Sequence, residues 1–173
     1  MKNNNKFEEF WIDYYEKRGA DSALLKYKRV GYASQATKQS IHNSILSRIT
    51  KKIDKCILDA GCGDGDLSSK FVKENEVLGV DTSSSMLIRA KKKGIKPILA
   101  NISNIPLPNK SVDIIICAEV LTHTLKPNNV LDEFFRLIRK KGEIIITGQN
   151  SLSLVRNLLK LIFEFFFNKK QPQ

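Results

Sequence analysis

Three glycines that alternate with other residues follow an acid at the end of an apolar run, in the segment CILDAGCGDGDLS, Cys56 to Ser68. Glycine has no Cβ atom, so the backbone beside it can approach a bound molecule closely. The segment therefore predicts a ligand-binding turn between a strand and a helix. The ligand could be a phosphate, a dinucleotide or a molecule of another kind.

Phosphate ligands fit this turn poorly. A phosphate-binding loop requires G-x-x-x-x-G-K-[ST], and no Lys-Ser or Lys-Thr pair follows these glycines. A dinucleotide loop, G-x-G-x-x-G/A, requires a small third residue, and Asp66 stands in that place. Its carboxylate would face the helix N-terminus at which a pyrophosphate binds, and the two negative charges would repel each other. The sequence therefore favours a ligand without phosphate.

The remaining pattern, D-x-G-x-G-x-G from Asp59 to Gly65, resembles motif I of the class I S-adenosylmethionine-dependent methyltransferases. Within that family it is most similar to the type 11 and quinone-type small-molecule enzymes. The resemblance implies S-adenosylmethionine as cofactor and S-adenosylhomocysteine as product. It also implies that backbone around the glycines contacts the methionyl part, and that the motif's first acid supports the loop and the amino end. These roles fall on Asp59, Gly61, Cys62 and Gly63.

Other positions match the family's nucleoside pocket in the same order along the chain. Asp81 ends an apolar run about twenty residues after the loop, where a carboxylate can accept hydrogen bonds from both ribose hydroxyls. The resemblance implies that Met86 packs on the nucleoside and that the amide oxygen of Asn101 accepts from the adenine amino group. Two further positions, which would edge the methionyl pocket, are Ala118 and Glu119. The cofactor set is completed by Thr82 and Ile102.

The segment CAEVLTHTL, which starts at Cys117, resembles the C-x-E-x-L-E-H segment of small-molecule and quinone-type methyltransferases. Methyl transfer needs a general base only where the nucleophile carries a proton. His123 is the catalytic candidate, as a general base or a substrate-orienting donor, because its ordinary pKa lies near neutrality. The alternative is a structural histidine that caps the loop before Pro127. Thr122 replaces the family's frequent acid, so an acid–histidine pair is missing.

The elements that must position these residues follow from the alternation of β-branched runs with helical segments. This order predicts an α/β fold, a Rossmann-like doubly wound and mostly parallel sheet with helices on both faces. The predicted strands are Cys56–Asp59, Glu76–Asp81, Lys96–Ala100, Val112–Ala118 and Glu143–Thr147, and the predicted helices between them are Leu67–Lys73, Ser84–Lys93 and Asn128–Lys140.

The length of 173 residues predicts a single domain, 1–173, divided into an N-terminal helical cap (1–50), a cofactor-binding core (51–150) and an amphipathic C-terminal helix with a tail (151–173). In the cap, apolar spacing predicts helices over Phe7–Arg18 and Ser40–Ile49. We expect the aromatic residues of the first helix to pack into the core rather than cap the cofactor pocket; they are Trp11, Tyr14 and Tyr15. His42 is expected at the surface, and Tyr27–Tyr32 is either a lid or an ordinary loop.

The segment from Gly148 to Gln173 differs from the family pattern. Family members usually continue with a helix and an antiparallel strand pair, whereas this segment predicts one amphipathic helix and a polar tail, so the strand pair is expected to be missing. An open sheet edge and clustered phenylalanines require cover. Residues 151–167 would cover the edge, form a homodimer, or lie on a membrane surface as a peripheral contact.

The net charge of +11 favours acidic partners, so an RNA methyltransferase is the alternative to an enzyme with a small or lipid-like acceptor. No N-P-P-Y-type motif supports nucleic acid. A non-catalytic cofactor-binding or partner subunit is the other alternative. It is motivated by the C-terminal segment, which departs from the family pattern, and by Thr122, which replaces the family's frequent acid.

The three cysteines form no C-x-x-C pair, which argues against zinc, an iron–sulfur cluster and disulfides, so no metal is expected. The absence of an apolar secretory or membrane-spanning run favours the cytoplasm, with a peripheral membrane position left open.

Overall fold

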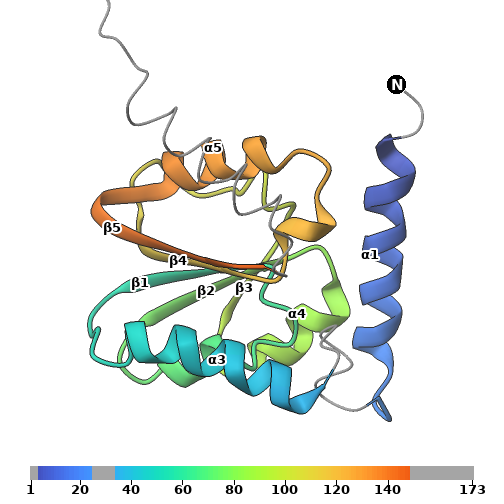
Figure 1. Cartoon of the computed structure of the whole chain (residues 1–173), viewed down its shortest axis with the longest axis horizontal. Helices are drawn as coiled ribbons and strands as arrows, with labels where there is room; N and C mark the ends of the chain where they lie inside the picture. The colour runs from blue at the N-terminus through green and yellow to red at the C-terminus, as the bar shows by residue number, and fades with distance from the viewer. Residues whose placement is uncertain (1–3, 25–33, 149–173) are drawn as a thin grey trace, which may run out of the picture.

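The computed structural model describes residues 4–24 and 34–148, which build a five-stranded sheet with helices on both faces (Figure 1). The strand order is β3-β2-β1-β4-β5, and every described pair is parallel. This confirms the predicted α/β class. The strands are β1 (Cys56–Ala60), β2 (Glu76–Asp81), β3 (Lys96–Leu99), β4 (Val112–Ala118) and β5 (Ile138–Thr147).

Alternate residues of the central strands enter two separate apolar cores. Ile57 points toward the face covered by α3 (Gln35–Ile49) and α4 (Ser84–Lys91), where it joins Ile45 and Leu87. Leu58, its neighbour in β1, joins Phe134 of α5 (Pro127–Leu137) on the other face. Both faces of the sheet are therefore buried, which explains why β4 is an almost continuous apolar run.

The first helix, α1 (Asn4–Ala20), lies apart from these two layers, beside α4 and the carboxyl end of the sheet (Figure 1). In the strand order β3-β2-β1-β4-β5, strands β1 and β4 are neighbours at the centre. The chain leaves β1 toward β2 on one side of this pair, and it leaves β4 toward β5 on the other side. The crevice between the carboxyl ends of β1 and β4 is thus the switch point at which open α/β sheets bind ligands.

Most predicted boundaries lie within three residues of those in the structure, and three segments differ more. Strand β5 starts at Ile138, directly after α5, whereas the helix was predicted to run to Lys140 and the strand to start at Glu143. The reason is local: Ile138 is buried and pairs with Val112, and a register shift follows before Ile114 pairs with Glu143. The basic run is therefore strand rather than the last turn of a helix.

The other two differences concern helices. The segment predicted as the helix Leu67–Lys73 contains only a short 3-10 turn, η1 (Ser68–Phe71). Helix α3 starts at Gln35, before the predicted start at Ser40, because the Ser34 hydroxyl accepts the N–H of Thr37 at 3.1 Å and caps it.

Two predictions lie outside the described residues: the lid or loop at Tyr27–Tyr32 and the amphipathic helix within 151–173. Among the helices that are described, none is both long enough and apolar enough to span a membrane.

Gly65 is predicted to be essential for the stability of the core. Its φ is +72°, and a Cβ atom there would lie 2.3 Å from Cδ1 of Ile95. Gly65→Ala should lower the free energy of unfolding by about 2–4 kcal/mol, through backbone strain and overpacking. Denaturant unfolding measures this. The control is Gly148→Ala, where nothing lies within 4 Å of the added Cβ, and equal stability loss in both variants would contradict the prediction.

Candidate functional site

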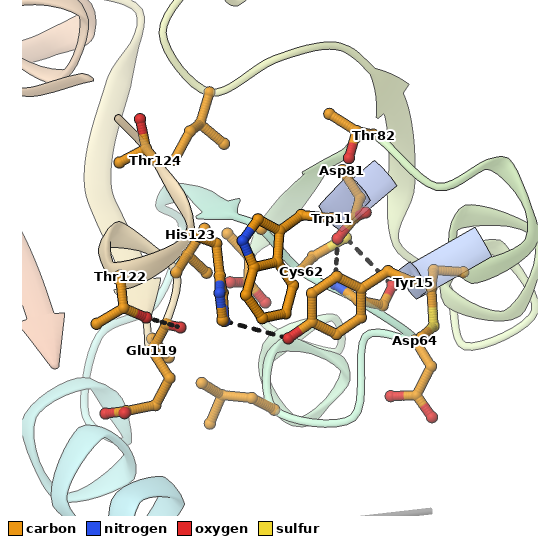
Figure 2. Close-up of a pocket in the computed structure, with 18 of the residues that line it drawn as sticks. Trp11, Tyr15, Cys62, Asp64, Asp81, Thr82, Glu119, Thr122, His123 and Thr124 are labelled. Carbon is orange, nitrogen blue, oxygen red and sulfur yellow. Dashed lines mark hydrogen bonds between the residues drawn. The ribbon is translucent and has the colours of Figure 1, made fainter. Parts of the chain in front are cut away.

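A cavity of about 260 Å³ opens at the carboxyl ends of the central strands (Figure 2). It is bounded by the glycine loop after β1, the ends of β2 and β4, and the helices α1 and α3. The structure brings every residue of the predicted cofactor set to this cavity, together with the catalytic candidate His123. The lining residues from that set are Asp59, Gly61, Cys62, Gly63, Asp81, Thr82, Met86, Asn101, Ile102, Ala118 and Glu119. Their binding roles remain predictions.

The carboxylate of Asp81 joins the first two strand ends (Figure 2). Its Oδ2 accepts the N–H of Gly63 at 2.8 Å, and its Oδ1 accepts the N–H of Ser83 at 2.9 Å. Burial raises the pKa of Asp81, while these backbone N–H groups act to lower it. Each oxygen retains a lone pair that can accept another hydrogen bond.

Asp59 supplies a second buried carboxyl group from β1. Burial raises its pKa to about 7, and the negative charge of Asp81 adds to the rise. Two acids that both resist ionisation therefore line one cavity. A cationic ligand would favour their charged forms and relieve this cost.

The two acids of the loop itself are balanced by lysines. Asp66 forms an ion pair with Lys38 of α3, whose side chain is buried, and the carboxylate of Asp64 lies 3.2 Å from Nζ of Lys93. The argument that the charge of Asp66 repels phosphate is thus weaker than the sequence suggested. The structure supplies another argument, because η1 provides one short turn rather than a full helix N-terminus for a phosphate.

At Gly61 and Gly65, the space that a side chain would need is filled by other residues of the protein. A Cβ at Gly61, where φ is +80°, would lie 2.4 Å from the side chain of Val120, which follows β4. At Gly65 the nearest atom belongs to Ile95. These glycines thus permit the loop to pack closely against Val120 and Ile95.

Helix α1 covers the cavity with aromatic side chains. Trp11 and Tyr15 line it, so the expectation that they pack into the core is wrong for these two residues. The Tyr15 hydroxyl lies 3.2 Å from Nε2 of His123, and the ring centroids of Trp11 and His123 are 4.1 Å apart (Figure 2). Tyr14 is not among the lining residues; its hydroxyl accepts from Arg18.

His123 lies in the short turn η2 (Leu121–His123) after β4, and burial lowers its pKa. Its Nε2 is engaged by Tyr15, whichever of the two groups donates. Its Nδ1 is buried and has no hydrogen-bond partner in the described part of the chain. In this conformation Nε2 is occupied by Tyr15, and Nδ1, unpaired among the described residues, is shielded from solvent.

Helix α3 contributes a wall that the sequence did not predict. His42 was expected at the surface but is only 4% exposed and lines the cavity with Thr37, Lys38 and Ile41. Burial lowers the pKa of His42 to about 4, and the nearby charge of Lys38 acts in the same direction. The signal that could have revealed this face is the spacing of Lys38, Ile41, His42 and Ile45 at three and four residues.

Glu16 was also missed, and it attaches α1 to the rest of the molecule. Its carboxylate accepts the hydroxyl of Ser83 at 2.7 Å and the hydroxyl of Ser84 at 3.1 Å. The N–H of Ser85 reaches the same carboxylate at 3.2 Å. A negative charge at the start of α4 is favourable because the N-terminus of a helix is electropositive. Burial acts to raise the pKa of Glu16, but these hydrogen bonds outweigh it and the pKa is lowered.

Comparison with known proteins shows the family to which the chain belongs. Residues 58–146 match the family described as "Methyltransferase domain". The chain is 31% identical to malonyl-[acyl-carrier protein] O-methyltransferase of Hamiltonella defensa over 81% of its length and 55% of the relative's. It is 31% identical to ubiquinone/menaquinone biosynthesis C-methyltransferase UbiE of Campylobacter jejuni, over 66% of its length and 52% of the relative's. The chain thus spans about half the length of these relatives.

A solved structure agrees in fold. Phosphoethanolamine N-methyltransferase 1 of Haemonchus contortus, in complex with phosphoethanolamine and S-adenosylhomocysteine, superposes with a TM-score of 0.74 and 16% identity. The match covers 86% of this chain and 34% of that one. At this level of identity the likeness concerns the fold.

The role of Glu16 can be tested with Trp11, the single tryptophan of the chain. Glu16→Ala removes hydrogen bonds that hold α1 at α4, which should weaken docking by about 1–2 kcal/mol at this partly exposed position. We expect the fluorescence of Trp11 to shift to the red as its ring leaves His123. In the control Glu9→Ala, an exposed position on the same helix, the emission should be unchanged. An unshifted spectrum in Glu16→Ala would contradict this role.

Proposed function

The chain belongs to the family of methyltransferase domains, and on that premise we propose that it binds S-adenosylmethionine in the cavity and transfers the methyl group to a small acceptor. One observation carries the proposal. The glycine loop and the carboxyl groups of Asp59 and Asp81 lie around one cavity at the switch point of the sheet.

The chemistry of the lining residues fits this cofactor. Bound there, S-adenosylmethionine supplies a methyl group on a positively charged sulfur, beside an ammonium group and a ribose. Asp81 offers one lone pair on each carboxylate oxygen to the ribose hydroxyls, and it is held in position by Gly63 and Ser83. Asp59 offers a carboxyl group that a nearby cation would drive into its charged form.

The remaining residues orient the acceptor and exclude water. Trp11 and Tyr15 cover the cavity from α1, so a bound acceptor would be screened from bulk solvent. Burial raises the pKa of Tyr15 to about 12, so its hydroxyl keeps its proton near neutral pH. If His123 acts as a general base, as its place at the cavity supports, Tyr15 must first release Nε2.

The lining of the cavity favours an acceptor without phosphate. Lys38 is the only lysine or arginine among the described lining residues, and Asp66 is its partner. Acidic side chains predominate: Glu8, Asp59, Asp64, Asp66, Asp81 and Glu119. The charge of +11 therefore lies elsewhere on the chain, and none of these residues supports an RNA acceptor. The names of the two relatives, a malonyl-[acyl-carrier protein] enzyme and a quinone-biosynthesis enzyme, support a small acceptor.

Cofactor binding is tested with S-adenosylhomocysteine and Asp81. Asp81→Ala removes the ribose acceptor and releases the loop, so we expect affinity to fall about 100-fold. Calorimetric titration measures the dissociation constant. The control Asp132→Ala changes an exposed acid on α5 outside the cavity and should bind as the parent does. Absence of binding to the parent protein, or equal binding to Asp81→Ala, would contradict the proposal.

Asp59 makes binding depend on pH. Its folded-state pKa of about 7 exceeds the unfolded value of about 4, so its carboxyl group costs stability progressively as pH rises from 4 to 7. A cationic ligand favours the ionised form, so affinity for S-adenosylmethionine should rise by up to about tenfold per pH unit below pH 7 and level off above it.

The control for this pH dependence is Asp59→Asn, which should bind more weakly and lack the rise below pH 7. Titrations in buffers of different ionisation enthalpy should also detect proton release on binding by the parent protein. The same pH profile in both proteins would show that Asp59 is not the titrating group.

A further inference from the structure

Asn101 occupies the place where the base of a bound nucleoside is expected. Strand β2 separates β3 from β1, so the end of β3 lies on the side of Asp81 away from the glycine loop. A ligand that reaches from the loop to Asp81 with its ribose continues toward the residues after β3. Asn101 follows that strand, and both it and the buried Ile102 line the cavity.

The amide oxygen of Asn101 already has two hydrogen-bond donors. Its Oδ1 lies 3.0 Å from the backbone nitrogen of Ser103 and 3.0 Å from the Ser103 hydroxyl. A backbone N–H can only donate, so the atom that faces it must be the oxygen and not the amide nitrogen. A carbonyl oxygen accepts two hydrogen bonds, and both places are filled.

The capacity that remains at Asn101 is that of a donor. Its Nδ2 carries two hydrogens and has no hydrogen-bond partner among the described residues. An aspartate held by Ser103 in the same way would instead offer a second oxygen, which accepts. The expectation that Asn101 accepts a hydrogen bond from the adenine amino group therefore does not fit its environment.

We propose that this cavity recognises the purine as a hydrogen-bond acceptor at Asn101, and so admits a 6-oxo purine nucleoside as readily as adenosine. The inference rests on the proposed function. Adenine presents an amino donor at position 6, whereas a 6-oxo purine presents a carbonyl oxygen there. The Nδ2 hydrogens of Asn101 match the oxygen and not the amino group.

The test compares S-adenosylhomocysteine with S-inosylhomocysteine, which differs only at the base. For the parent protein, calorimetry should give dissociation constants within about tenfold of each other, since the 6-amino group of adenine gains no hydrogen bond from Asn101. Asn101→Asp restores an acceptor and should shift the ratio toward the adenosyl ligand by about tenfold or more. Because both ligands carry the same amino-acid part, the ratio is insensitive to the added charge.

Asn128→Asp is the matched control, since it makes the same change at an exposed position of α5 outside the cavity and should leave the ratio unaltered. The inference would be overturned if the parent protein preferred the adenosyl ligand by more than about 100-fold and Asn101→Asp gave the same ratio of dissociation constants. The proposed function would still stand in that case. If neither nucleoside binds any variant, the proposed function fails and the inference falls with it.

Discussion

The hydrogen bonds of the Asp81 carboxylate are the interaction on which the other parts of the site depend. One oxygen holds the glycine loop through Gly63, and the other holds the start of α4 through Ser83. Ser83 in turn caps α4 and donates to Glu16, so the position of α1 is set from the same point. The glycine loop, Asp81 and the aromatic side chains of α1 are therefore positioned by one connected set of hydrogen bonds. A shift at the end of β2 would move all three.

The distribution of charge gives this arrangement its second property. The chain as a whole is strongly basic, yet its cavity gathers acids whose negative charge is only partly balanced, by Lys38 and Lys93. Burial keeps both cavity histidines close to neutral by lowering their pKa values, so they add little positive charge. The charges of its lining residues favour cationic or neutral ligands in the cavity, whereas most of the basic residues of the chain lie outside it. The overall charge of such a protein says little about what its cavity binds.

The sequence predicted the sheet, and it selected residues that the structure brings to one cavity, because both follow from short-range patterns. Alternating apolar runs identify the strands, and their ends carry Asp59, Asp81 and Ala118 to the cavity. It did not predict the walls from α1 and α3, because which face of an amphipathic helix meets a cavity depends on contacts with residues distant in the chain. The start of β5 was missed for the same reason, since only pairing with Val112 makes a strand of a basic segment beside a helix.

The contact between Tyr15 and His123 joins residues 108 positions apart, and the contacts of Glu16 span 67 to 69 positions. Contacts this distant close long loops, and the entropy lost in closing them must be offset by the contacts made at their ends. Among the described residues, the contacts of α1 through Glu16 and Tyr15 are therefore with parts of the chain far from it in sequence. We therefore expect the cover over the cavity to open at a lower free energy than the one needed to unfold the core.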